Sequence, residues 1–170
     1  MIKGRELVSL PVVTQDDRRQ VGEVKDFIYD PVCHKILGYL VENSGWFKDG
    51  RGFLHSDVIY REDDCMVIEN EQVIKKIGAI PELKEAVGQK KDIRGFRVEE
   101  ANGHYVGVIQ DVVVNGNTGD ITGYEISDGI IQDLLDGRIT IPNEGINIGC
   151  DKVVAIEGAA MDTTMKGEFL

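Results

Sequence analysis

The chain has 170 residues, 42% hydrophobic and 29% charged, which is enough apolar material to bury one or two small cores. Its 30 acidic residues outnumber 19 basic ones, and this net charge of −11 opposes binding to nucleic-acid phosphates or to anionic membrane surfaces. We therefore expect a protein partner and no direct nucleic-acid binding.

Targeting and membrane signals are not visible in the sequence. The longest uninterrupted apolar runs cover only a few residues, such as 112–114, so no membrane span is predicted. Residues 1–7 lack the apolar region of a secretory signal, and the three cysteines, an odd number without a CxxC pair, favour reduced thiols. These features predict a cytoplasmic protein.

Alternating apolar residues predict strands in the first part of the chain, because side chains on a strand alternate between two faces. A turn at 31–34 separates the two best strands. The expected strands cover residues 6–13, 23–30, 35–42, 52–55, 57–60 and 65–69.

Better helix formers follow at 71–77 and 81–87, where Pro81 suits a first helical position and Gly88 a helix end. We expect a helical connector over residues 71–89.

Strands are predicted again after the connector, with an Asn-Gly hairpin turn at 115–120. Residues 130–135 resemble one or two inserted helical turns, and the tail at 159–170 lacks a period and is expected to be frayed. The expected strands of this part cover residues 93–99, 108–114, 121–127, 138–141, 145–148 and 152–156.

The second part repeats the first. Shifting the sequence by 85 residues aligns 8–41 with 93–126 without a gap and gives seven identities, including two glycines, an aspartate and a tyrosine. A shift of 87 residues continues the match, aligning Leu54 with Ile141 and Met66 with Val153. A repeat of this length indicates two copies of one module.

The repeated motifs are VGEVKDFIYD at 21–30 with ILGYLV at 36–41, and VGVIQDVVVN at 106–115 with ITGYEI at 121–126. They resemble the signature of the PRC-barrel family, which includes the cytoplasmic barrel of the photosynthetic reaction centre H subunit. The C-terminal domain of a ribosome-maturation factor is similar too. The resemblance implies a small β-barrel that serves protein interaction or assembly, without a shared catalytic centre.

We therefore predict an all-β protein of two PRC-like barrels, with about six strands each and short connecting helices. The first barrel is expected over 1–70 and the second over 90–158. The predicted function is a non-enzymatic cytoplasmic interaction or assembly scaffold. The alternative is a ribosome-maturation or RNA-processing accessory that acts through a ribosomal protein. Homo-oligomerisation is left open.

The repeated polar and glycine positions have structural explanations. Gly38 and Gly123 lie inside strands, where a bulge or sharp bend would need glycine. Asp26 and Asp111 share a strand face with apolar residues, so we expect each carboxylate to accept hydrogen bonds from nearby backbone or hydroxyl groups.

Neither catalysis nor cofactor binding is expected. The sequence has no GxSxG, Walker or GxGxxG motif, and no histidine recurs at its equivalent position. Four residues of types that bind zinc are scattered along the sequence without the short, regular spacing of a zinc site: Cys33, His34, His55 and Cys65. A plain hairpin turn explains residues 115–120 better than a calcium loop does. We predict no catalytic residue, no metal site and no cofactor.

One loop is a candidate partner-binding site. Trp46, the only tryptophan, lies beside Phe47 in a turn-rich stretch close to Arg51. Loop aromatics next to arginine are typical anchors for a partner protein. In the other interpretation, these aromatics cover the mouth of their own barrel and seal its core.

Overall fold

A computed structural model describes residues 1–42, 50–127, 139–150 and 152–155. The chain divides into two compact units. The first contains Met1–Asp92 with Val114–Asp120, and the second contains Ile93–Val113 with Ile121–Leu170. Each unit therefore holds one copy of the repeat, except that the tip of the second hairpin belongs to the first unit.

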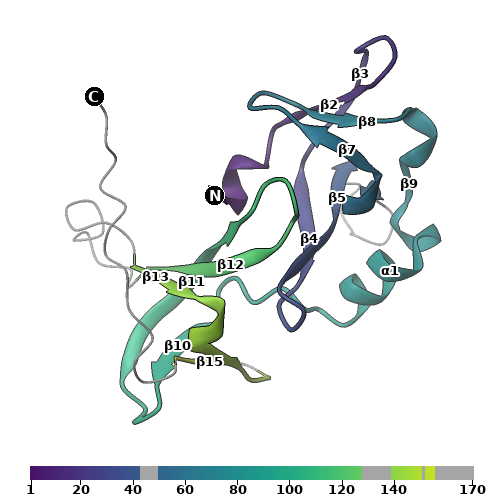
Figure 1. Ribbon diagram of the computed structural model, residues 1–170. Coiled ribbons are helices and arrows are strands. Elements are labelled where there is room, and N and C mark those ends of the chain that lie inside the picture. Colours follow the sequence, from purple (N-terminus) through teal and green to yellow (C-terminus); the bar gives the residue numbers. More distant parts are fainter. Residues whose placement is uncertain (43–49, 128–138, 151, 156–170) are drawn as a thin grey trace, which may run out of the picture. The chain divides into compact units, whose positions relative to one another are not determined.

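The described residues form strands, several short 3₁₀ helices and one α-helix (Figure 1). In the first copy the strands are β1 (Ile2–Lys3), β2 (Pro11–Thr14), β3 (Gln20–Glu23), β4 (Asp26–Asp30), β5 (Lys35–Glu42), β6 (Arg51–Leu54), β7 (Val58–Arg61), β8 (Met66–Ile68) and β9 (Lys75–Lys76). Helix α1 (Pro81–Gly88) follows. The second copy contains β10 (Arg97–Glu100), β11 (Tyr105–Val114), β12 (Ile121–Ser127), β13 (Ile139–Pro142), β14 (Ile146–Ile148) and β15 (Lys152–Ala155).

The first copy forms two four-stranded sheets, ordered β3-β2-β8-β7 and β4-β5-β6-β9 (Figure 1). The alternating apolar residues that predict these strands are buried, among them Val12, Phe27, Leu40 and Phe53. Their burial is the main stabilising term for short strands of this kind, since an isolated hairpin is marginal in water.

The segment expected to connect the copies packs within the first unit. Instead of one helix over 71–77, it forms a 3₁₀ turn at Glu71–Val73 and the strand β9, which pairs with β6. Helix α1 begins at Pro81, as predicted, and its buried Leu83 and Ala86 join the apolar cluster of Ile28 and Leu40. Burial of this apolar stripe holds α1 against β4 and β5.

The second copy forms one sheet with the path β13-β12-β11-β10-β15-β14. Strand β11 is equivalent to β3 and β4 of the first copy taken together. When these two are joined, the first copy has the corresponding order β6-β5-β4/β3-β2-β8-β7. In each copy the first strand pairs in parallel with the last one, β2 with β8 and β10 with β15. The penultimate strand, β7 or β14, therefore lies at the end of its sheet path.

Strand pairing corrects the repeat alignment at two places. Val12 lies opposite Gly22 and Val98 opposite Gly107, so Val12, rather than Val13, is the equivalent of Val98. Likewise Phe53 pairs with Tyr39 and Ile141 with Tyr124, so Phe53, rather than Leu54, is the equivalent of Ile141. The constant shifts of 85 and 87 residues missed both because insertions lie in turns and loops, where sequence identity is low.

The all-β class is confirmed, but closed barrels are not seen among the described residues. Each sheet path runs between two outer strands: β3 and β7, β4 and β9, or β13 and β14. No helix in the described parts of the chain is long and apolar enough to span a membrane.

The repeated aspartates accept backbone hydrogen bonds, as the sequence predicts, and the repeated glycines allow close approach of paired strands. Asp26 and Asp111 each accept a hydrogen bond at 2.8 Å from the backbone N–H of the next residue. A methyl group on Gly38 would collide with the Phe53 carbonyl oxygen, and one on Gly123 would lie 2.7 Å from that of Ile141. These contacts are equivalent, because close approach of paired strands requires glycine in both copies.

Candidate partner-binding edge

The outer strand β7 exposes two large apolar side chains. Ile59 and Tyr60 are each 43% exposed, although β7 is paired with β8 along its other side. The register shifts between Val58 and Tyr60, which places Ile59 at a bulge. An outer strand carries backbone groups that a further strand can pair with, so exposed apolar residues on it favour protein binding.

A guanidinium group from another turn lies over this strand. Arg18 donates to the Tyr60 hydroxyl at 3.3 Å and to both carboxylate oxygens of Glu62, at 3.2 and 2.5 Å. The hydrogen bonds of Arg18 lower the pKa of Glu62, with a smaller effect from the Cys65 thiol. The bidentate pair fixes Arg18 beside Tyr60, and Tyr and Arg are the residue types that dominate binding energy at protein interfaces. We call Arg18, Ile59, Tyr60 and Glu62 the β7 edge.

Cys65 lies beneath the β7 edge. Its thiol is 6% exposed and donates to Glu62 at 3.1 Å. Burial raises the pKa of Cys65, and the Glu62 carboxylate raises it further, so the thiol stays protonated and unreactive near neutral pH. Glu62, Asp64 and Cys65 place possible metal-ligand atoms within 4.8 Å of one another. Arg18 already donates to both Glu62 oxygens, and the Cys65 thiol donates to Glu62 as well. Hydrogen bonds within the protein therefore account for the close spacing of this cluster.

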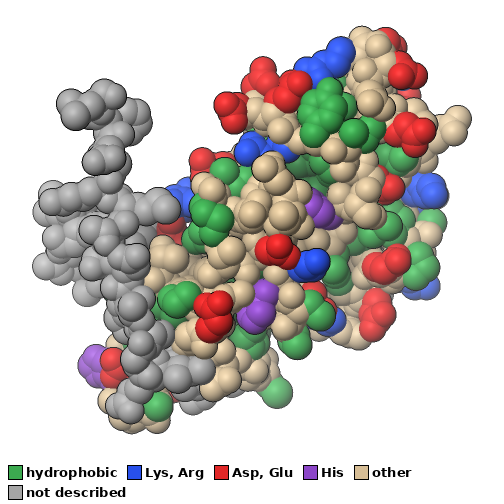
Figure 2. Space-filling model, in the orientation of Figure 1, with side chains coloured by type: hydrophobic (Ala, Val, Ile, Leu, Met, Phe, Trp, Pro, Cys, Tyr) green, Lys and Arg blue, Asp and Glu red, His purple; other side chains and the backbone are tan. Residues whose placement is uncertain are grey.

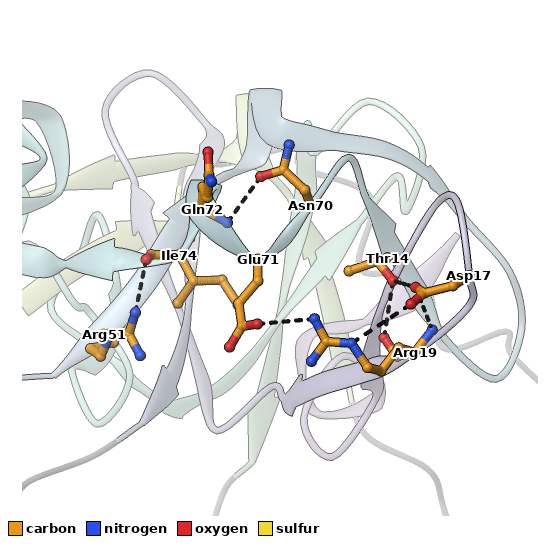
Figure 3. A network of polar contacts seen from close by, with 8 residues as sticks. All are labelled: Thr14, Asp17, Arg19, Arg51, Asn70, Glu71, Gln72 and Ile74. Atoms are coloured by element: carbon orange, nitrogen blue, oxygen red, sulfur yellow. Dashed lines mark hydrogen bonds and ion pairs between the residues drawn. The ribbon is translucent and has the colours of Figure 1, made fainter.

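Arg51, the described member of the predicted partner-binding loop, bonds to the backbone of its own unit. It donates to the Ile74 carbonyl at 3.1 Å, and a few residues earlier in the chain the Asn70 side chain accepts from the Gln72 N–H at 2.9 Å (Figure 3). In the same region Arg19 pairs with Glu71 at 3.0 Å (Figure 3). Trp46 and Phe47 lie outside the described residues, so the partner-binding role of this loop stays a prediction.

The residues of zinc-binding type lie in different settings. Cys33 and His34 belong to the β4–β5 turn, where the Cys33 N–H donates to Asp30. His55 is hydrogen-bonded through Nδ1 to the Tyr39 hydroxyl at 2.8 Å, whereas Cys65 contacts Glu62.

Sequence reasoning predicted the strand at 57–60 but did not identify the β7 edge. Ile59 and Tyr60 are consecutive apolar residues, and only one of two successive side chains on a strand can face a core. That break in alternation is the signal that could have found them. The contribution of Arg18 could not be found, because it comes from a turn 42 residues away from Tyr60.

Comparison with known proteins identifies a family. No curated protein matches the sequence. The family model described as the PRC-barrel domain matches twice, over residues 1–86 and 89–161. These two matches coincide with the two copies and cover most of the chain. The chain therefore belongs to the PRC-barrel family and carries two copies of its domain.

Proposed function

We propose that the protein is a non-enzymatic interaction scaffold of the cytoplasm, and that its first copy binds a partner protein through the β7 edge. The observation that carries the proposal is the pair of exposed apolar side chains, Ile59 and Tyr60, on an outer strand. A partner strand added along β7 would gain backbone hydrogen bonds and cover both side chains.

The second copy supports a specific role for this edge. Strand β14 is the equivalent outer strand, and Asn147 occupies the position of Tyr60, opposite the last strand of its sheet. Asn147 is exposed and polar, whereas Tyr60 is exposed and aromatic. Strands β7 and β14 occupy equivalent outer positions in their sheets. Because β14 is stable there with a polar residue, the fold itself does not require the apolar residues of β7.

Charge points to the chemistry of the partner. Lys and Arg side chains lie scattered among Asp and Glu on the visible face (Figure 2). The net charge of −11 favours association with a basic protein segment and disfavours nucleic acid.

Structural roles of the repeated polar residues support a function without catalysis. Asp26 and Asp111 accept hydrogen bonds from their own backbone, and Asp30 and Asn115 do the same for turn amides. A repeated residue that caps its own turn or strand contributes to the fold and leaves no free reactive group at that position.

The test is a quantitative pull-down with the full chain as bait. Changing Ile59→Lys together with Tyr60→Ala is expected to lower partner capture by about tenfold, because the anchor side chains are removed and a charge is placed on the edge. The control variant Asn147→Lys alters the equivalent β14 edge and is expected to retain capture. Equal capture by all variants contradicts the proposal.

A third variant separates the β7 edge from the predicted loop. If Trp46→Ala abolishes capture while the β7 variant retains it, the loop of Trp46, Phe47 and Arg51 is the binding site. Recovery of a ribosomal small-subunit protein as the partner would support the alternative function in ribosome maturation. Turnover that a single polar substitution abolishes would contradict the scaffold proposal.

A further inference from the structure

The tip of the β11–β12 hairpin, residues 114–120, is held by the first unit. The Ile36 N–H donates to the Gly119 carbonyl at 2.8 Å, and Lys35 forms an antiparallel bridge with Asp120. The Lys35 ammonium also lies 3.6 Å from the Asp120 carboxylate. We call this set of contacts the hairpin dock. Its bonds join the backbone of β5 directly to the turn.

One imidazole lies between the turn and the buried core of the first unit. The Nδ1 atom of His55 is 2.8 Å from the Tyr39 hydroxyl, and Tyr39 is 1% exposed. On the other side of the ring, a methyl group on Gly119 would lie 2.8 Å from Nε2. Gly119, with a φ of 73°, thus lets the turn backbone lie directly against His55.

The protonation state of His55 decides whether its Nδ1 atom can accept the hydrogen bond of the Tyr39 hydroxyl. The backbone carbonyls of Asn117 and Thr118 accept from the ring nitrogen that faces the turn, so in the neutral ring Nδ1 accepts from the Tyr39 hydroxyl, whose pKa is raised by burial. The single ring proton then resides on Nε2, which faces the turn. Protonating Nδ1 replaces the acceptor by a second donor and brings a positive charge into a half-buried contact.

The charged groups around the ring act in both directions. Burial lowers the pKa of His55, whereas hydrogen bonds from the ring to the backbone carbonyls of Asn117 and Thr118, and the Asp120 carboxylate, raise it. Lys35, from the start of β5, lowers it. Arg61, from β7, lies near Gly116 of the same turn. The net pKa lies below the ordinary value of 6.5, so the docked state favours the neutral ring.

We propose that His55 makes the hairpin dock pH-sensitive: the neutral ring holds residues 114–120 on the first unit, and the protonated ring releases them. The sign follows from proton linkage. A docked state that binds its proton less readily than the released state loses stability as the pH falls below about 6.5. The equivalent position in the second copy, at the start of its 3₁₀ turn, is Asn143, which does not titrate.

Hydrogen–deuterium exchange followed by NMR gives a residue-level test on the wild-type chain. The Ile36 amide is protected only while it donates to Gly119, and its protection factor is expected to fall by up to about tenfold per pH unit below pH ~6.5. The Gly119 amide donates to Asn115 within the hairpin and serves as the internal control. Its protection is expected to change much less.

Three variants test whether His55 is responsible. His55→Asn introduces the residue of the second copy, and the Ile36 protection factor is expected to lose its pH dependence. His104→Asn, at an exposed position of the second unit, is the matched control and is expected to keep it. Tyr39→Phe removes the hydroxyl that donates to the neutral ring, so release is expected to begin at a higher pH.

Two results would overturn the proposal. One is parallel loss of Ile36 and Gly119 protection in the wild-type chain, which would indicate general unfolding. The other is an unchanged pH profile of Ile36 in folded His55→Asn. If that variant does not fold, the Tyr39→Phe profile decides, and the absence of a shift would count against His55.

Discussion

The two copies of the repeat reach the same strand order with different strand continuity. In the second copy β11 runs without interruption from Tyr105 to Val114 and belongs to one sheet. In the first copy the equivalent segment is divided into β3 and β4, which belong to two sheets. At the division, the Val24 N–H donates to Leu10 and the Lys25 N–H to Leu40.

This difference shows which features of the module are essential. Although the strand is interrupted at Val24 and Lys25, their two backbone N–H groups still donate to Leu10 on one side and to Leu40 of β5 on the other. What both copies retain is the parallel pairing of first and last strands and the close approach at Gly38 or Gly123. Continuity of one strand can therefore vary, whereas the contacts between strands are retained.

The largest expected effect breaks the strand contact that both copies share. Gly38→Ala would force a methyl group against the Phe53 carbonyl and within 2.9 Å of Leu83, and it is expected to cost about 3 kcal/mol of unfolding free energy. Gly123→Ala meets the Ile141 carbonyl at 2.7 Å with fewer close neighbours, and should cost about 2 kcal/mol. Urea unfolding followed by circular dichroism measures both, and a cost near zero at either glycine would contradict a shared role.

A medium effect distinguishes the two hairpin turns. Asp30 and Asn115 each accept two turn amides, but only Asp30 is buried and accepts from Lys91, at 2.6 Å. Burial by itself raises the pKa of Asp30, yet hydrogen bonds from Lys91 and the turn amides bring it below 3.8. The stabilisation is therefore present above pH 3.8 and is lost as the pH falls through the lowered pKa.

Asp30→Asn keeps the turn acceptor and removes the charge, so it is expected to cost about 1 kcal/mol at pH 7. The difference from the wild type should shrink as the pH falls below 3.8. Unfolding free energies measured from pH 7 to pH 3 test this. Asn115→Asp is the control in the second copy, and a stability gain there as large as the loss at Asp30 would contradict the role of Lys91.

The smallest expected effect is that of replacing His34, the left-handed residue of the first turn. His34 has a φ of 52° and Gly119, its equivalent, a φ of 73°. Because a left-handed backbone is strained for most residues, His34→Gly is expected to stabilise the protein by about 0.5 kcal/mol. Gly119→Ala should destabilise it by about 1 kcal/mol, since the methyl group also meets His55. Thermal unfolding measures both, and a destabilised His34→Gly variant or a stabilised Gly119→Ala variant would refute the equivalence.

Sequence periodicity predicted most strands of both copies, helix α1 and the hydrogen bonding of Asp26 and Asp111, but it missed β1 and β3. It did not predict β9 at Lys75–Lys76, because lysine has a low strand propensity and these two residues form a strand only through pairing with β6. The alignment of the repeat was right in the central strands. It was wrong by one residue for Val12 and for Phe53, where turn and loop lengths differ between the copies.

The amino-acid sequence by itself determined the duplication, the all-β class and the family, because these depend on local alternation and on motifs stated twice in one chain. Only the tertiary structure decided that β7 lies outermost, that Arg18 joins Tyr60, and that His55 contacts the turn at 114–120. Those features arise from pairing between segments far apart in the chain. Such pairing depends on the geometry of the whole sheet, to which local sequence patterns are insensitive.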